Sequence, residues 1–358
     1  MAVVATGFFD GVHLGHRLVT DTLLAEAHRR GERSVVVTFW PHPRTVLQDD
    51  ARSLRLLTSL QEKKEMLSAL GVDGVEVLDF TREFSRLTAE QYLRDVLIGR
   101  LGCTAIVLGY DNRMGSDGLS RDAVRSLALS LGLDVISCGS VQFPQGRIAS
   151  SDSSALRHCP SGNRATLGNV RGRGPSSDGR GPAEQDVSGG AVPQGGGPAI
   201  SSTKIREALE RGEVGSAAKM LGYRYCLHGV VVAGNRLGRT IGYPTANMHL
   251  YEPLKLVPSN GVYLVEVETL GSHYYGMTNI GVRPTVSGAG VRSIETHIFD
   301  FDELIYGLDI KVRFVRKIRD ERRFGSLDEL RDRLAADEAE CRKLLGADIV
   351  VTGSNSDE

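Results

Sequence analysis

The alternation of two kinds of segment over residues 1–143 constrains the fold more than any other feature of this chain. Short apolar runs typical of buried strands take turns with longer amphipathic stretches typical of helices. Strands that are covered by helices on both faces have such continuous apolar sequences, so the pattern predicts an α/β fold with a Rossmann-like parallel sheet. The predicted strands are 2–6, 35–39, 75–78, 105–108 and 134–137, and the predicted helices are 14–30, 61–70, 89–100 and 121–131.

The pattern changes near residue 224. After two more predicted helices, at 204–211 and 214–221, short alternating segments are separated by Gly and Pro, which predicts a small antiparallel barrel. Its predicted strands are 228–233, 261–268, 273–280, 293–300 and 310–318, and an S-x-x-E capping box at Ser326 predicts a final helix. We therefore expect one domain at 1–224, a barrel domain with a C-terminal helix at 225–350, and a disordered tail at 351–358.

Residues 150–199 differ from both domains in composition. They are rich in Gly, Ser and Pro and contain no aromatic residue. Such a segment buries too little apolar surface to offset its ordering entropy, so we predict a disordered insertion in the first domain. Arginines among its glycines loosely resemble an RNA-binding tail, but a solvated linker is the favoured interpretation.

Charge and cysteine content exclude several classes of protein. The net charge of −1 provides no basic field that would recruit nucleic acid or an anionic membrane, so neither is an expected partner. The five cysteines are widely separated and form no CxxC pair, which argues against a disulfide framework and a zinc site. There is also no leader-like start and no apolar run long enough for a membrane helix, so we expect a cytoplasmic protein. No oligomeric state is predicted.

A glycine turn with two histidines carries the first candidate site. Residues 7–16 read GFFDGVHLGH and connect a predicted strand to a predicted helix. Glycines let the backbone approach a ligand closely, and a helix start offers unpaired N–H groups to an anion. His13 and His16 share one face of that helix start and suit a phosphate chain whose charge grows during transfer. A metal pair is the alternative, but no third ligand of the right type is nearby.

A glycine-rich loop carries the second candidate site. Residues 229–247 read GVVVAGNRLGRTIGYPTAN, and glycines at 234, 238 and 242 make this loop flexible enough to lie over a ligand. Pro244 fixes the backbone before Thr245 and Asn247. The side-chain oxygens of these two residues can point the same way from an extended segment, and hard oxygen ligands suit Mg²⁺. Taken alone, however, PTAN would be an ordinary turn.

A strand glutamate adds to the second site. Residues 294–301 read IETHIFDF, where Ile294, Thr296 and Ile298 face one way and Glu295 and His297 face the other. The ordinary interpretation of a strand glutamate is a solvated side chain.

These motifs resemble those of one enzyme family, and they occur in the same order. GFFDGVHLGH resembles the HxGH signature of nucleotidylyltransferases, and it is followed by TFWPHP at 38–43, GYDNRMG at 109–115 and ISSTKIR at 200–206. The glycine loop with PTAN, then NIGVRPT at 279–285 and the strand with Glu295, resemble riboflavin kinase. Together they resemble the bacterial bifunctional riboflavin kinase/FMN adenylyltransferases, with Met114 standing where that family usually has an aromatic residue.

The resemblance implies two ATP-dependent reactions with flavins as substrates and products: phosphorylation of riboflavin to FMN, and adenylylation of FMN to FAD. It implies catalytic roles for His13, His16 and Glu295, with Glu295 as the base that deprotonates the riboflavin 5′-hydroxyl, and Mg²⁺ ligation by Thr245 and Asn247. The implied contacts to ATP and flavin come from Gly7, Phe9, Asp10, Gly11, Asp111, Arg113, Ser202, Thr203, Arg206, Gly234, Gly238, Arg239, Pro244 and Asn279.

Two alternatives remain at this point. The chain could be a riboflavin kinase with a degenerate adenylyltransferase domain, because Met114 and the insertion at 150–199 depart from the family pattern. It could also be a flavin-binding sensor without catalysis, although His13, His16 and Glu295 are all retained.

Overall fold

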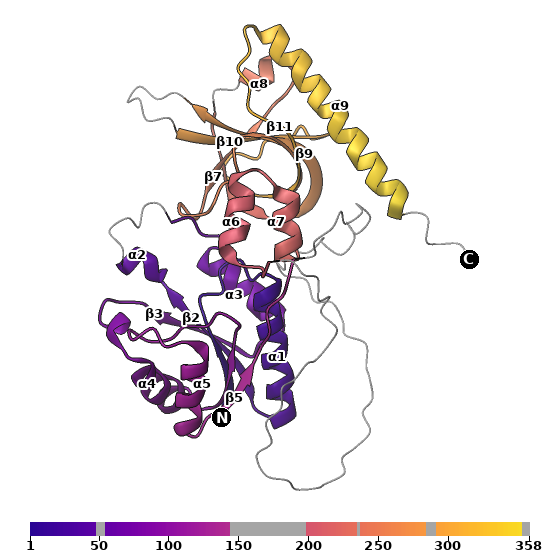
Figure 1. The fold of residues 1–358 in the computed structure, drawn as a ribbon. Coiled ribbons are helices and arrows are strands. Elements are labelled where there is room, and N and C mark those ends of the chain that lie inside the picture. Colours follow the sequence, from indigo (N-terminus) through magenta and orange to yellow (C-terminus); the bar gives the residue numbers. More distant parts are fainter. Residues whose placement is uncertain (48–53, 144–197, 235–236, 284–290, 353–358) are drawn as a thin grey trace, which may run out of the picture. The chain divides into compact units, whose positions relative to one another are not determined.

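The computed structural model describes residues 1–47, 54–143, 198–234, 237–283 and 291–352 (Figure 1). The chain divides into two compact units. Among the described residues, the first unit takes 1–47, 54, 60–143 and 198–200, and the second takes 55–59 and 201–352. The predicted insertion at 150–199 and the predicted tail lie almost wholly outside the described residues, except that 198–199 are described and 351–352 form the end of the last helix.

The first unit is built on a five-stranded parallel sheet with the strand order β3-β2-β1-β4-β5. The strands are β1 (Ala2–Thr6), β2 (Arg33–Trp40), β3 (Gly74–Asp79), β4 (Cys103–Leu108) and β5 (Asp134–Ser137), so the predicted parallel α/β sheet is confirmed. Its central strand β1 is buried at every position and forms the floor of the core. The order of the strands reverses between β1 and β4, which is where ligands bind in open sheets of this kind.

Helices cover this sheet, with α1 on one side and α4 and α5 on the other (Figure 1). Their bounds are α1 (Leu14–Arg30), α2 (Pro43–Leu47), α3 (Leu60–Ala69), η2 (Phe84–Arg86), α4 (Ala89–Gln91), η3 (Tyr92–Arg100) and α5 (Arg121–Ser130). The helix predicted at 89–100 consists of one turn of α-helix followed by a π-helical stretch, η3. The helix α2 was not predicted from the sequence.

The second unit contains a closed antiparallel barrel, as predicted, with the strand order β10-β7-β6-β11-β8-β9. The strands are β6 (Cys226–Val232), β7 (Ala246–Leu250), β8 (Gly261–Thr269), β9 (Ser272–Arg283), β10 (Val291–Ile298) and β11 (Asp309–Arg319). The helices are α6 (Ser202–Glu210), α7 (Val214–Leu221), the single turn α8 (Leu237–Thr240) and α9 (Leu327–Thr352). Two elements, α8 and β7, were missed, because their residues were interpreted as a loop and a turn.

The C-terminal helix α9 begins at the predicted capping residue. The backbone N–H of Glu329 donates to the Ser326 hydroxyl at 3.2 Å, and the Glu329 carboxylate accepts from Gly325 N at 3.0 Å. Asp337, fully buried on α9, accepts from Arg319 of β11 at 2.8 Å, which ties the helix to the barrel. No described helix has both the length and the apolar character needed to cross a membrane.

A short strap from early in the chain belongs to the second unit. Residues 55–59 lie between the first unit's α2 and α3 in sequence, yet Leu56 pairs in parallel with Lys255. The backbone N–H of Leu56 donates to Leu254 O and that of Leu256 donates to Leu56 O, both at 2.8 Å. Leu56 and Leu57 are fully buried. The unit division by contacts therefore differs from a single cut near residue 224, because the strap, α6 and α7 are grouped with the barrel.

The described segments on either side of residues 144–197 are hydrogen-bonded to each other. Gln142 pairs with Ala199 in an antiparallel bridge, Ile200 N donates to Val141 O at 2.9 Å, and Phe143 N donates to Pro198 O at 3.2 Å. Residues 143 and 198 thus lie close together.

Candidate active sites

The turn after β1 has a strained backbone. Phe9 and Val12 have positive φ angles of 52° and 36°, and Gly11 between them has a φ of 82°. Positive φ is unfavourable for a β-branched residue such as Val12, and strain of this kind concentrates at ligand-binding sites. The turn is held at its start by Gly7 N, which donates to Val37 O of β2 at 3.0 Å.

His13 caps the helix that follows. Its Nδ1 accepts the backbone N–H of His16 at 3.3 Å, and the two imidazole rings stack with their centroids 3.6 Å apart. Because Nδ1 is the acceptor, a neutral His13 carries its proton on Nε2 and can donate from that atom. Gly15 accommodates this arrangement, since a Cβ there would lie 3.1 Å from the His13 ring.

His16 is held neutral. Burial lowers the pKa of His16 well below 6.5, and the charges of His13 and then Lys63 lower it further. Its Nδ1 is buried and has no hydrogen-bond partner among the described residues. An orphaned polar nitrogen at a helix start is an atom that a ligand can satisfy.

The loop after β4 is tied to the end of β1. The side-chain amide of Asn112 donates to Thr6 O at 3.3 Å, which brings the GYDNRMG segment to the edge where the strand order reverses. Asp111 and Arg113 on this loop are exposed, whereas Met114 is buried and packs in the core of the first unit. The residue that departs from the family pattern therefore fills the core.

The ISSTKIR segment forms the start of α6 in the second unit. The Ser201 hydroxyl accepts from Lys204 N at 3.4 Å and caps the helix, with Ser202 and Thr203 in its first turn. Arg206 donates from Nε to the carbonyl of Arg55 in the strap at 2.8 Å. The structure thus places Ser202, Thr203 and Arg206 together on one helical turn.

Three residues of the second candidate site lie side by side across the barrel. Glu295 of β10 is directly opposite Asn247 of β7 on one side and Asn279 of β9 on the other. Directly opposed side chains lie on the same face of a sheet, about 4.5–5.5 Å apart at Cβ. Glu295 is half-buried, while Ile294 and Thr296 on the other face are buried, as the alternation predicted.

The glycine loop packs against this row. A side chain at residue 234 would collide with the side-chain amide of Asn247 and displace it. At residue 238 a side chain would collide with the carbonyl of Tyr243, whose N–H donates to Gly238 O at 2.7 Å. These two contacts explain, in steric terms, why the loop carries Gly234 and Gly238.

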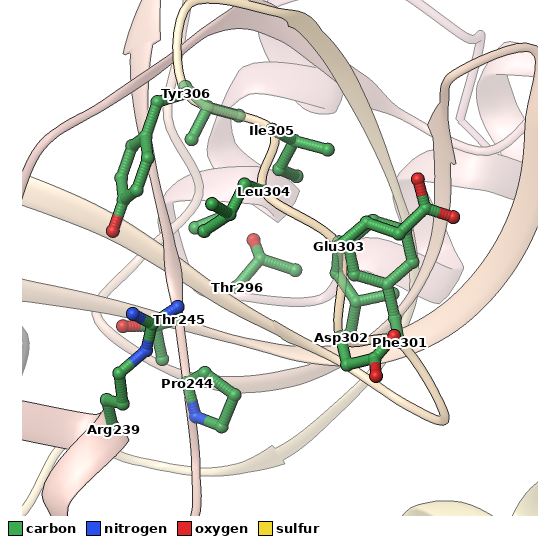
Figure 2. A pocket seen from close by; sticks show the side chains of 13 residues that line it. Arg239, Pro244, Thr245, Thr296, Phe301, Asp302, Glu303, Leu304, Ile305 and Tyr306 are labelled. Carbon is green, nitrogen blue, oxygen red and sulfur yellow. The ribbon is translucent and has the colours of Figure 1, made fainter.

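A cavity of about 220 Å³ opens beside Thr245 (Figure 2). Arg239, Pro244 and Thr245 line one wall, and the loop from Phe301 to Tyr306 lines the other. Apolar groups of Ile298, Leu304 and Ile305 make much of its surface, and a cavity of this kind suits a flat heteroaromatic ring next to a charged group.

Sequence reasoning missed several residues that hold these sites. His297 Nδ1 lies 2.8 Å from Pro244 O and so fixes the entry to PTAN, and a buried hydrogen bond of 2.8 Å between Thr278 and Thr296 locks β9 to β10 behind Glu295. In the first unit, Lys63 of α3 is fully buried beside the turn after β1. The available signal was helical spacing. Met66 and Leu67 follow Lys63 by three and four residues and face the core, so Lys63 lies on the same face of α3.

Comparisons with known proteins agree with the order of the two sites. A family model described as FAD synthetase matches residues 1–152, and one described as riboflavin kinase matches residues 221–345. The bifunctional riboflavin kinase/FMN adenylyltransferase of Bacillus subtilis is 32% identical over 95% of this chain and 91% of its own. That of Escherichia coli K12 is 34% identical, over 96% and 93% respectively.

A solved structure gives the same picture of the fold. A Streptococcus pneumoniae protein described as a macrolide-efflux protein superposes with a TM-score of 0.75 at 30% identity, covering 95% of this chain and 93% of its own. The two family models together span most of the chain, and the curated relatives match it over nearly its full length. The chain therefore belongs to the family of bifunctional riboflavin kinase/FMN adenylyltransferases.

Proposed function

We propose that the two units of this chain divide the two reactions of its family. The second unit phosphorylates riboflavin with ATP to give FMN and ADP, and the first unit transfers the adenylyl group of a second ATP to FMN, giving FAD and pyrophosphate. The observation that carries this proposal is the row of Asn247, Glu295 and Asn279 on three neighbouring strands of the barrel. In this row a carboxylate lies between two side-chain amides, in a unit other than that of the stacked histidines, which supports one reaction for each unit.

In the kinase reaction Glu295 is the base. An alcohol is a poor nucleophile until it loses its proton, so Glu295 takes the proton of the riboflavin 5′-hydroxyl as that oxygen attacks the γ-phosphorus of ATP. The bond between the γ-phosphorus and the bridging oxygen breaks, and ADP leaves. Asn279 positions the flavin side of the row, and the loop with Gly234, Gly238 and Arg239 covers the phosphates.

The same unit fits a magnesium ion. The described residues contain no group of three or more His, Cys, Asp and Glu that could enclose a metal. Thr245 offers a hydroxyl on the cavity wall, and Asn247, two residues further along, offers an amide oxygen. Mg²⁺ favours few protein oxygens together with waters and phosphates. We assign Mg²⁺ to Thr245 and Asn247, where it neutralises charge on the ATP phosphates when bound.

Adenylyl transfer needs no base, because the FMN phosphate is already ionised at neutral pH. Its oxygen attacks the α-phosphorus in line, so positioning and charge stabilisation account for catalysis. His13 donates from Nε2 to the phosphates, and His16 offers its orphaned nitrogen. The strained turn contributes Gly7, Phe9, Asp10 and Gly11, and the β4 loop contributes Asp111 and Arg113. The family resemblance also implies ATP contacts from Ser202, Thr203 and Arg206, which lie at the start of α6 in the second unit.

Crossed variants test the division of labour. The purified protein is incubated with riboflavin, ATP and Mg²⁺, and riboflavin, FMN and FAD are separated by chromatography over time. We expect His13→Ala/His16→Ala to accumulate FMN, because each lost phosphate donor costs on the order of 10²–10³ in rate. Glu295→Gln should lose FMN formation by roughly 10²–10⁴ yet convert added FMN to FAD.

Glu340→Gln, an exposed glutamate of α9, serves as the control and should change neither reaction. A wild-type protein that makes FMN but no FAD would establish the kinase-only alternative. A folded wild-type protein that binds flavin but consumes no ATP would establish the other alternative, a flavin-binding sensor without catalysis. If the histidine variant lost both reactions equally while folded, the assignment of one reaction to each unit would be wrong.

A cytoplasmic location and the lack of nucleic-acid and membrane partners stay predictions from the sequence.

A further inference from the structure

Lys63 is a buried cation next to the candidate adenylyl-transfer site. It lies on the inward face of α3, and its side chain is fully buried. Its ammonium donates to Phe8 O at 2.8 Å and to the Thr38 hydroxyl at 3.1 Å, and it lies 3.8 Å from the centroid of the Phe8 ring. Burying a lysine is costly, and a methionine would fill a similar space without that cost, so the charge calls for an explanation.

The contacts of Lys63 join the turn after β1 to strand β2 at the carboxyl end of the sheet. Phe8 O accepts from Lys63 and also from the Thr38 hydroxyl, at 3.1 Å, so the end of β2 and the turn after β1 meet at one carbonyl. Phe8 immediately precedes the positive-φ residue Phe9. Fixing the Phe8 carbonyl therefore restrains the strained backbone that leads to His13.

The charge of Lys63 also acts on its surroundings. It is one of the causes that lower the pKa of His16, and thus helps to keep that imidazole neutral. Burial lowers the pKa of Lys63 itself to about 8, while Asp10 on the turn opposes this and favours the charged form. Lys63 therefore carries most of its charge at neutral pH, whereas His16 carries none.

We propose that Lys63 is a positioning residue for adenylyl transfer, whose ammonium fixes the turn after β1 and supplies a preorganised positive charge beside the start of α1. The proposal rests on the proposed assignment of that turn to the ATP phosphates. A fixed charge in a site shielded from water stabilises developing negative charge without reorganisation, which a neutral imidazole pair does less well.

Two variants separate the charge from the packing. Lys63→Met removes the charge and keeps most of the volume, and Lys63→Arg keeps the charge. Adenylylation of FMN is measured in each, and riboflavin phosphorylation in the same preparations serves as the internal control. We expect kcat/KM for ATP in adenylylation to fall on the order of 10²-fold in Lys63→Met, to recover in part in Lys63→Arg, and phosphorylation to be unchanged.

The pH profile distinguishes a positioning charge from a purely structural lysine. In the wild type, kcat/KM for ATP in adenylylation should fall above about pH 8 as Lys63 loses its proton in the free enzyme. The titratable groups around it are Asp10 on the turn and His13 and His16 on α1. His16 is already neutral in this range. If the fall in kcat/KM at alkaline pH disappears in Lys63→Met and moves to higher pH in Lys63→Arg, the fall is caused by deprotonation of Lys63.

Each outcome decides something. A folded Lys63→Met that adenylylates FMN as the wild type does would overturn the inference, and if His13→Ala/His16→Ala were equally active, the proposed site would itself be wrong. If Lys63→Met fails to fold, Thr38→Val removes one acceptor of the ammonium instead. In that variant the fall of kcat/KM at alkaline pH should begin at a lower pH. An unchanged pH profile would contradict the proposed role of Lys63.

Discussion

The protonation of His16 links the first candidate site to the stability of the fold. The folded chain holds the pKa of His16 well below 6.5, mainly because the ring is buried, whereas the unfolded chain binds a proton near 6.5. Below that pH, His16 binds a proton in the unfolded state but not in the folded state. The stability associated with neutral His16 is thus present above about pH 6.5 and is lost as the pH falls towards the folded pKa. In that range the free energy of unfolding falls by about 1.4 kcal/mol for each pH unit.

We therefore predict that the melting temperature of the wild type falls more steeply between about pH 7.5 and about pH 5.5 than that of His16→Asn. Circular dichroism melts at several pH values measure the two slopes. His28→Asn, at an exposed position in the last turn of α1, is the matched control and should keep the wild-type slope. Equal slopes for the wild type and His16→Asn would show that His16 is protonated freely in the folded state.

At the scale of residues, the sequence predicted which side chains lie together in the first candidate site, but not the contacts that fix their positions. The spacing of His13 and His16 was sufficient to place both at one helix start. Their stacking and the capping role of His13 depend on the positive φ of Val12, which no local pattern encodes. No role was predicted for Lys63, because its contacts come from residues 25 and 55 positions away in the chain.

At the scale of elements, the segments on either side of residues 144–197 are hydrogen-bonded to each other. Because Phe143 and Pro198 are already joined, a short turn can replace the chain between them without moving either end. We predict that a Gly/Ser turn of about four residues in place of 145–196 preserves the melting temperature and both reactions. Thermal melts and the chromatographic assay measure this. A large fall in melting temperature would show that the predicted disordered segment contributes to the fold.

The elements that were predicted correctly have strong local patterns. The five strands of the parallel sheet are apolar runs bounded by turns, and the barrel strands β8 to β11 alternate clearly. The strand β7 was missed because it begins two residues after Pro244 in a segment that was interpreted as a turn. Its pairing with β6 and β10 is what makes it a strand. The π-helical η3 was missed because an extra residue per turn leaves no mark on the sequence pattern.

At the scale of the whole molecule, the strap determines what a stable kinase fragment must contain. A fragment from residue 224 lacks α6, α7 and the strap, all of which are grouped with the barrel. Burial of a leucine side chain contributes about 1.5–3 kcal/mol, and the strap buries Leu56 and Leu57 completely.

We predict that residues 201–358 melt at a higher temperature when 54–59 is fused ahead of them through a flexible linker. Both fragments should phosphorylate riboflavin, and differential scanning calorimetry measures the gain. The same fusion carrying Leu56→Asp and Leu57→Asp is the control and should show no gain. Identical melting temperatures for all three fragments would mean that the strap adds nothing to the second unit.

The strap also imposes an order on synthesis. Leu56 emerges from the ribosome about 200 residues before Lys255, its bridge partner, so at roughly 5–20 residues per second it waits on the order of ten seconds or more. During that time the backbone of Leu56 lacks its pairing partners at residues 254–256. We expect a chain whose synthesis stops before the barrel to carry an unpaired apolar segment at 55–59, which is the kind of segment that chaperones bind.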